Sequence, residues 1–365
     1  MRRRLAAVWK AVWKVARWPL MVLAVGIILL LAPVAYIELG CRATSTADTY
    51  RPLITNPTFQ RREANTYLTY PEWHIVYAYD GLAEVLERGD EHRFDHWASI
   101  AGFWRSTCSV MRVADEHGGA DWDTRSMIHT IGVSFTAEMS AKAAYEETIG
   151  RAAAALRGQK KTAQDTAVAQ ISADYATFLR QTPWYKYPFA VKRHELWSAP
   201  ARGVRAWERR VGIGLELAAK AAYARVIAAA VAAQAPAALL IRSVVTGIDQ
   251  NTLAGIPTTT IVAVRPGGIE IETPRYDLFT RILAEIARRG GTMREIAGND
   301  DIMVTVTVPA GADAPRLPRG HVIMRMPRDG FASDRLLVDL KVSDLTSLLE
   351  AYPLGDPGVE HVFDY

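Results

Sequence analysis

The sequence predicts a multidomain chain with an N-terminal transmembrane helix, a mainly α-helical bundle domain and then a small α+β sandwich domain. Three observations predict this order. Residues 20–39 form an apolar stretch, apolar residues then recur at helical spacing to about residue 245, and alternation with a period of two follows. We therefore expect a basic tail at 1–19, an anchor at 20–40, a tether at 41–65, a helical domain at 66–248 and an α+β domain at 249–365.

The apolar stretch at residues 20–39 reads LMVLAVGIILLLAPVAYIEL, and Glu38 is its only ionisable residue. A helix of this length spans about 30 Å, which is the thickness of the hydrocarbon core of a bilayer. Six basic residues precede it: Arg2, Arg3, Arg4, Lys10, Lys14 and Arg17. The positive-inside rule then predicts a single-pass protein of a bacterial inner membrane, with a cytoplasmic N-terminus and an extracytoplasmic body.

The N-terminus allows other interpretations. Residues 5–16 place Leu, Val and Trp at helical spacing beside two lysines, which fits an amphipathic helix on the inner leaflet as well as a basic flank that only sets topology. A cleavable signal would have a shorter apolar region, and Glu38 disfavours a lipoprotein junction at Gly40-Cys41. We expect an uncut anchor. A cytoplasmic body is the alternative if the positive-inside rule does not apply to this chain.

The positive charge of the chain comes from its tail. The chain has 43 basic and 39 acidic residues, and six of the basic residues lie before the apolar stretch, so 37 basic residues remain against 39 acidic ones. A body that is close to neutral lacks the basic surface of a nucleic-acid-binding protein. Residues 42–65 contain two prolines and show neither period, which predicts a tether between bilayer and body.

Helix signals dominate residues 66–245. Thr69 and Glu72 have the spacing of a capping box and predict a helix start. Apolar stripes then predict helices at about 97–111, 122–156 and 162–180, and together these indicate a bundle.

An alanine-rich stretch at 211–233 could be mistaken for a second membrane span. Glu216, Lys220 and Arg225 interrupt it, and a charge at the centre of a span costs about 2.5 to 3.5 kcal/mol. Glu216 and Lys220 also have the i, i+4 spacing of an ion pair on a solvated face. We expect a soluble helix here.

Strand signals dominate the C-terminal part. Residues 269–272 read IEIE, residues 304–308 read VTVTV, and Gly-Asn-Asp and Asp-Gly turns separate the runs. Helical stripes fall near residues 278–286 and 345–351. The resulting order β-β-α-β-β-β-β-α-β predicts one antiparallel or mixed sheet with two helices on one face.

Cys41 and Cys108 would permit one disulfide in an oxidising compartment. Cys108 lies in the apolar stripe of residues 97–111, where a free cysteine commonly packs as a small apolar side chain. We therefore expect the two cysteines to be unpaired.

Four residues are candidates for catalysis in the helical domain. Glu138 lies on the helical wheel with residues that look core-facing, among them Tyr145, so its carboxylate must be paired or have a raised pKa. Lys142, four residues on, is the expected partner. On the first helix, Tyr77 and Asp80 lie on one side. If an active site exists, it contains Glu138 with Tyr145 and Asp80 with Tyr77; packing or interface roles are the alternative.

We expect neither a cofactor nor a metal. His92 and His96 lie four residues apart at a helix start, but no third ligand stands at metal-binding spacing. No phosphate-binding loop, nucleophile elbow or dinucleotide-binding glycine motif is present.

Anchoring without a catalytic motif suggests a function in binding. We expect a protein of the cell envelope that contacts the lipid bilayer through residues 20–39 and binds a protein partner or an apolar ligand on the extracytoplasmic side, without nucleic acid. The alternative is a membrane-tethered enzyme that acts on lipid or envelope material through acid/base carboxylates of the helical domain.

Overall fold

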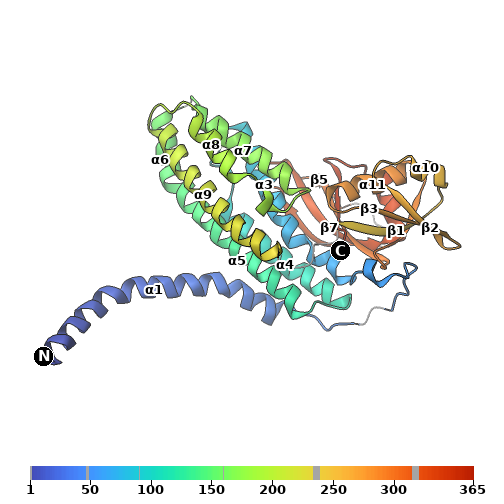
Figure 1. The fold of residues 1–365 in the computed structure, drawn as a ribbon, viewed down its shortest axis with the longest axis horizontal. Helices are drawn as coiled ribbons and strands as arrows, with labels where there is room; N and C mark the ends of the chain where they lie inside the picture. Colours follow the sequence, from blue (N-terminus) through green and yellow to red (C-terminus); the bar gives the residue numbers. More distant parts are fainter. Residues whose placement is uncertain (1, 47–48, 90, 159, 233–238, 315–319) are drawn as a thin grey trace.

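The computed structural model describes residues 2–46, 49–89, 91–158, 160–232, 239–314 and 320–365. Figure 1 shows a long N-terminal helix that leaves the body at one side, a group of helices packed side by side, and a β region at the opposite side. The chain is thus a mixture of helices and two small antiparallel sheets with one apolar helix at its N-terminus, as the sequence predicts in outline.

The N-terminal helix α1 covers Arg2–Gly40. Its portion Arg17–Gly40 is the one described helix long and apolar enough to cross a membrane, and its side chains are almost entirely exposed. A single candidate span near the N-terminus is therefore confirmed. The tail and the apolar portion form one continuous helix.

The helical region consists of α2 to α9, with a single π-helical turn η2 between α5 and α6. Their bounds are α2 Ala64–Leu68, α3 Tyr70–Arg88, α4 His96–Glu116, α5 Trp122–Tyr145, η2 Glu146–Gly150, α6 Arg151–Arg157, α7 Ala163–Leu179, α8 Phe189–Ser198 and α9 Val204–Ala232. Short 3₁₀ turns occupy Pro57–Phe59, Trp184–Lys186 and Val342–Asp344.

Local side-chain caps determine where several of these helices begin. Asp95 and Asp121 accept hydrogen bonds from backbone N–H groups in the first turns of α4 and α5, and Thr162 and Asp165 form a capping box at α7. The capping box predicted at Thr69 is wrong. The Thr69 hydroxyl donates to the carbonyl of Thr66 because α2 already precedes α3 at this point.

Two four-stranded antiparallel sheets form the β region. The first has the order β2-β3-β1-β4 and the second β6-β7-β5-β8. The strands are β1 Leu240–Thr246, β2 Thr260–Arg265, β3 Gly268–Pro274, β4 Thr292–Ile296, β5 Asp301–Pro309, β6 His321–Pro327, β7 Ser333–Lys341 and β8 Gly358–Val362. The helices α10 Gln250–Ala254, α11 Asp277–Arg288 and α12 Leu345–Ala351 connect them.

The predicted single sheet is therefore wrong in two respects. Leu240–Thr246, which we placed in the helical domain, is strand β1, and it pairs with both β3 and β4. The predicted strands also divide into two sheets, because β5 pairs with β7 and β8 and with no strand of the first sheet in the described chain. Pairing between distant strands decides this, and the alternation of single strands carries no information about it.

The two sheets are copies of one β-β-β-α-β unit. In each unit the first strand is central, the second is at the edge, and a helix separates the third strand from the fourth. Register irregularities fall at equivalent places, between Val244 and Val245 and between Thr305 and Val306 where the first strand meets the fourth. Helix α11 contacts β8 and α12 contacts β4, so each helix reaches the last strand of the other unit.

One apolar core lies between the two units, and a second fills the helical region. The strand β5 contributes side chains to both cores. Ile302, Val304 and Val306 face the first core, whereas Met303 joins the core of the helices. The outer face of the second sheet therefore packs directly on the helical region.

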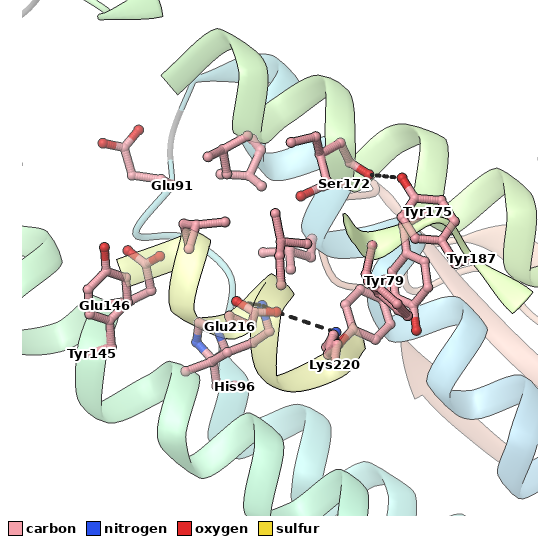
Figure 2. Close-up of a pocket in the computed structure, with 18 residues that line it drawn as sticks. Tyr79, Glu91, His96, Tyr145, Glu146, Ser172, Tyr175, Tyr187, Glu216 and Lys220 are labelled. Atoms are coloured by element: carbon pink, nitrogen blue, oxygen red, sulfur yellow. Dashed lines mark hydrogen bonds and ion pairs between the residues drawn. The ribbon is translucent and has the colours of Figure 1, made fainter. Parts of the chain in front are cut away.

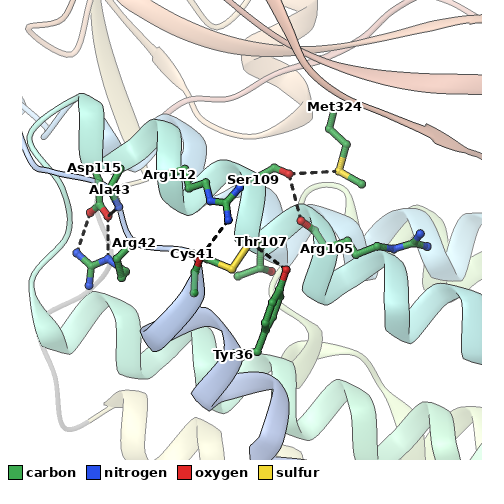
Figure 3. The surroundings of a disulfide bond; sticks show 12 residues. Tyr36, Cys41, Arg42, Ala43, Arg105, Thr107, Ser109, Arg112, Asp115 and Met324 are labelled. Carbon is green, nitrogen blue, oxygen red and sulfur yellow. Dashed lines mark hydrogen bonds and ion pairs between the residues drawn. A yellow bond between two sulfur atoms is a disulfide. The ribbon is translucent and has the colours of Figure 1, made fainter.

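The predicted absence of a disulfide is also wrong. Cys41, which follows α1 directly, is joined to Cys108 of α4 (Figure 3). The end of α1 crosses α4, so the buried stripe that holds Cys108 faces α1 at this position. Arg42 beside it donates two hydrogen bonds of 2.8 Å to Asp115, and Glu38 pairs with His129 at 2.7 Å instead of reaching towards lipid headgroups.

The described part of residues 41–65, the expected tether, contacts the body at several places. Ile54 is fully buried, and the buried carboxylate of Glu295 on β4 accepts hydrogen bonds from the backbone N–H groups of Leu53 and Ile54 and from the hydroxyl of Tyr50. The segment thus passes from the end of α1 across the first sheet to α2. Its described residues bind the body at several points, which the prediction of a tether did not include.

Candidate functional site

The helical region encloses a small cavity between α3, α5, α7, α8 and α9 (Figure 2). Its volume is about 50 Å³. Apolar and aromatic side chains form most of its wall. The ionic groups at its two ends belong to a cluster around Lys220, here called the lysine cluster, and a cluster around Arg205 and Arg209, here called the arginine cluster. A volume of this size accommodates a few water molecules.

The lysine cluster consists of Tyr79 on α3, Glu138 and Lys142 on α5, and Glu216 and Lys220 on α9. The ammonium of Lys220 lies 2.6 Å from Glu138 and 3.3 Å from Glu216, and it donates a hydrogen bond of 2.7 Å to the hydroxyl of Tyr79. Lys142 pairs with Glu216 at 2.8 Å. Tyr79 donates to Glu138. Each charge is thus matched by opposite charges on another helix.

Aromatic rings surround the ammonium of Lys220. It lies 4.7 Å from the ring centre of Tyr79, 4.8 Å from that of Tyr175 and 5.8 Å from that of Phe189. Attraction between the cation and the ring faces adds to its ion pairs. Phe189, at the end of the aromatic residues 184–189, thus packs beside this cation.

The ion pairs fix the charges of the lysine cluster. Burial by itself would raise the pKa of Glu216, but Lys142 and Lys220 outweigh burial and lower that pKa to about 2. Burial would lower the pKa of Lys220, yet Glu138 and the neighbouring phenols hold it well above its ordinary value. Burial and Glu138 raise the pKa of Tyr79 well above its ordinary value. At neutral pH these groups are a carboxylate, an ammonium and a neutral phenol, so none of the three is poised to exchange a proton.

The arginine cluster lies at the other end of the cavity, where α6, α7 and α9 meet. Arg205 and Arg209 have only 2% and 1% of their side chains exposed. Arg205 lies within 3.0 Å of Glu91, Asp165 and Glu208. Burial would raise the pKa of Asp165, but hydrogen bonds from Thr162 and the nearby arginines lower it to about 2.

The π-helical turn η2 positions two members of this cluster. Glu146 binds Arg209 with both carboxylate oxygens, one of them at 3.0 Å, and Tyr145 donates to Glu208. A single π turn inside an α-helix changes the direction of side chains and recurs at functional sites. Here it turns Tyr145 and Glu146 inwards and leaves Glu147 and Thr148 on the outer side.

Two of the sequence candidates lie at this cavity. Tyr145 lines it, and Glu138 belongs to the lysine cluster, but Tyr145 interacts with Glu208 and not with Glu138. The expected pair of Glu138 with Lys142 is wrong, since Lys220 is the partner of Glu138. The expected solvated pair of Glu216 and Lys220 is half-buried and faces Tyr79.

The other two candidates, Asp80 and Tyr77, lie where α3 packs on the second sheet. Asp80 is paired with Arg180 at 2.6 Å, and burial raises its pKa to about 6. The hydroxyl of Tyr77 lies 3.1 Å from the hydroxyl of Thr305, and the guanidinium of Arg335 stacks 3.5 Å from its ring centre. Neither residue lines the helical cavity.

Sequence inspection missed Tyr79, Arg205 and Arg209. The spacing of Arg205, Glu208 and Arg209 on one helix was an available signal for a charged inner face. The cavity has buried ion pairs, no room for a substrate of several atoms, and charges that already satisfy one another. The ion pairs thus join α3, α5 and α9 around the cavity, and removal of one partner would leave a poorly solvated charge.

Comparison with protein-family models, with curated proteins and with solved structures finds no match for this chain.

Proposed function

We propose that this chain is a single-pass, membrane-anchored protein of the bacterial cell envelope whose extracytoplasmic body, a helical bundle joined to a small α+β sandwich, binds a protein partner through the outer face of α9. The observation that carries the proposal is an exposed apolar stripe on that helix. The stripe consists of Val204, Trp207, Val211, Leu215, Ala222 and Val226.

The geometry of the stripe fits a partner helix. At 100° per residue its members lie within about 100° of one another, and they extend over about 33 Å of helix. Leu215 is 66% exposed and Val226 is 65% exposed. The exposed Arg225 lies in the same arc, so the apolar part of the stripe is continuous only before it. An apolar strip on a folded surface is typical of an interaction site, and its width fits the apolar face of another helix.

Arginines and tryptophans border one end of the stripe. The guanidinium of Arg210 lies 4.9 Å from the ring centre of Trp207 and 5.4 Å from that of Trp197, and Arg193 lies 5.6 Å from Trp197. Tryptophan and arginine are enriched among the residues that dominate protein interfaces. This end of α9 is therefore the expected centre of binding energy.

The disulfide supports an extracytoplasmic body. Disulfides persist in oxidising compartments such as the periplasm and are rare in the cytosol. Cys41 immediately follows the candidate span, so the compartment of the bond is the compartment of the body. The cluster of basic residues before the span independently favours a cytoplasmic N-terminus.

The structure gives less support to the alternatives. An apolar ligand or a lipid substrate needs a cavity of several hundred Å³, whereas the helical cavity holds about 50 Å³. A membrane-tethered enzyme would also need an acid or base with access to a substrate. Glu138 is engaged by Lys220 and Tyr79 instead.

Photo-crosslinking in cells tests the proposal. A photoreactive phenylalanine analogue at Leu215 is expected to give a discrete crosslinked product, whose mass tells a second copy of the chain from a different protein. Leu278 on α11 is an exposed leucine outside the stripe and serves as the matched control site. Absence of a product at residue 215, or an equal yield of the same product at residue 278, refutes binding through α9.

A further inference from the structure

Three side chains that are far apart in the sequence converge at the junction of the helices and the second sheet. Glu63 precedes α2, His117 follows α4, and Asp301 begins β5. The Nδ1 atom of His117 lies 3.2 Å from Oε2 of Glu63 and 3.6 Å from Oδ2 of Asp301. All three candidate ligand atoms lie within 4.8 Å of one another.

The two separations that involve His117 are close to those between ligand atoms around a small metal ion. Bonds of Zn²⁺ to nitrogen and oxygen ligands are about 2.0 to 2.2 Å long, so two ligands of a tetrahedral site lie roughly 3.3 Å apart. The two distances from His117 agree with this value to within a few tenths of an ångström. Imidazole and carboxylate together favour Zn²⁺ or a related transition metal over Mg²⁺, which prefers oxygen ligands and water.

The surroundings support ligation. The backbone N–H of Asp301 donates to Oε1 of Glu63 at 3.0 Å, which orients the carboxylate so that its other oxygen points to His117. Lys341 lies 2.7 Å from Asp301 and 3.0 Å from Asp300. Hydrogen bonds of this kind orient ligands in metal sites. Lys341 binds the Oδ2 atom of Asp301, so that oxygen would ligate the ion through its other lone pair, and Nδ1 of His117 would exchange its contact with Glu63 for the ion.

An open pocket borders the three residues. It has a volume of about 420 Å³, and Tyr50, Arg51, Glu116, Asp300 and Lys341 contribute to its wall. Three protein ligands leave the fourth position of a tetrahedral ion to water or to a further ligand. The pocket gives that position access to solvent.

We propose that Glu63, His117 and Asp301 bind one divalent transition metal ion, Zn²⁺ in the first instance, at the junction between the helical region and the second sheet. The proposal does not depend on membrane anchoring or on partner binding. It replaces the expectation of a chain without metal. That expectation arose because the sequence offers no short ligand motif: 54 residues separate Glu63 from His117, and 184 separate His117 from Asp301.

A competing explanation is that His117 is protonated and bridges the two carboxylates as an ion pair. Burial lowers the pKa of His117, but the hydrogen bond with Glu63 and the neighbouring acids outweigh burial, so the net shift is upward. The two explanations predict different effects of removing the imidazole on Zn²⁺ binding. Only the metal site predicts a saturable, histidine-dependent affinity for Zn²⁺.

Calorimetric titration of the full-length protein in detergent, stripped with a chelator that is then removed, decides between them. We expect one Zn²⁺ per chain and no heat from Mg²⁺. His117→Ala should weaken Zn²⁺ binding at least 100-fold and Glu63→Gln at least 10-fold, while the control His194→Ala, an exposed histidine of α8, keeps wild-type affinity. Absence of Zn²⁺ binding to wild type, or undiminished binding to His117→Ala, overturns the proposal.

A second measurement covers the case in which His117→Ala does not fold. Because a ligand that binds only the folded state stabilises it, Zn²⁺ should raise the thermal midpoint of the wild type. Glu63→Gln keeps the size of the side chain and its neutral hydrogen bonds, so it should fold but gain little from Zn²⁺. An equal rise of the midpoint in wild type and Glu63→Gln contradicts the site.

Discussion

Replacement of Arg209 by methionine removes a cation from the arginine cluster while it keeps most of the packing volume. Only 1% of the Arg209 side chain is exposed. Its guanidinium binds both carboxylate oxygens of Glu146 and lies 3.7 Å from Asp165. Arg205 remains close to Asp165 in the variant, so the acid that loses its main partner is Glu146.

The structure gives the size of the effect. Removal of one partner of a buried ion pair costs about 3 to 5 kcal/mol, because the other charge stays in a poorly solvated place. Glu146 has 14% of its side chain exposed, so little water can replace the guanidinium. We therefore expect Arg209→Met to lower the free energy of unfolding by about 3 kcal/mol or more. Glu146→Gln in the same chain should restore part of this loss, because it removes the unpaired charge.

The neighbouring residue supplies a matched control. Glu147 pairs with Arg151 at 2.6 Å on the outer side, and both side chains are more than 40% exposed. Arg151→Met should leave the free energy of unfolding unchanged within error, since water solvates the remaining carboxylate. Urea unfolding followed by tryptophan fluorescence measures both variants, with Trp207 two residues from the perturbation. Equal losses for Arg209→Met and Arg151→Met would refute the argument that burial makes the arginine cluster costly to break.

Three further predictions concern the disulfide and two titrating groups. In intact cells, neither Cys41 nor Cys108 should react with a thiol reagent unless the protein is first reduced and unfolded; labelling of both without reductant contradicts an oxidising compartment. Because the pKa of Glu216 is lowered, its contribution to stability is present above its ordinary pKa of 4.5 and is lost as the pH falls towards 2. In Glu216→Gln the unfolding midpoint should therefore fall less steeply between pH 4.5 and pH 2 than in the wild type. The same pH dependence in both proteins contradicts this. Burial and Asp95 raise the pKa of Asp329 from 3.8 to about 6. The neutral form therefore contributes stability that is fully present below pH 3.8 and is lost as the pH rises through 6. Asp329→Asn should therefore stabilise the protein by about 2 kcal/mol at pH 8 relative to its effect at pH 4. Equal effects at both pH values would count against the assignment.

The sequence predicted single elements well where one period dominated over many residues. Alternation in residues 304–308 gave a strand, and β5 is a fully buried central strand. β1 was missed because the domain boundary was placed after Leu240–Thr246, where Gly, Asn, Pro and Thr become frequent, although Pro236 already ends the predicted helix before this strand. Periodicity could not predict the division into two sheets, because strand partners such as β5 and β8 are distant in the sequence.

For the same reason, the ion-pair partners at the candidate site could not be predicted from the sequence. Glu138 was placed on the inner face of its helix correctly, but a helical wheel offers only partners three or four residues away. The actual partner, Lys220, lies 82 residues further on and on another helix. Similarly, Cys108 was assigned to the core from its stripe alone, whereas the crossing of α4 by the end of α1 brings Cys41 to it.

The repeat of the β unit explains how the N-terminal segment is held to the body. Glu295 on β4 and His361 on β8 occupy equivalent positions beside the register shift of each unit, and both side chains are fully buried. Glu295 binds residues 50–54, whereas the His361 ring stacks 3.5 Å from that of Trp73 on α3. The same place in each unit therefore receives the segment that follows α1 in one unit and the helical region in the other. Because that segment is also fixed at Cys41, a displacement of α1 would act on both the helices and the first sheet.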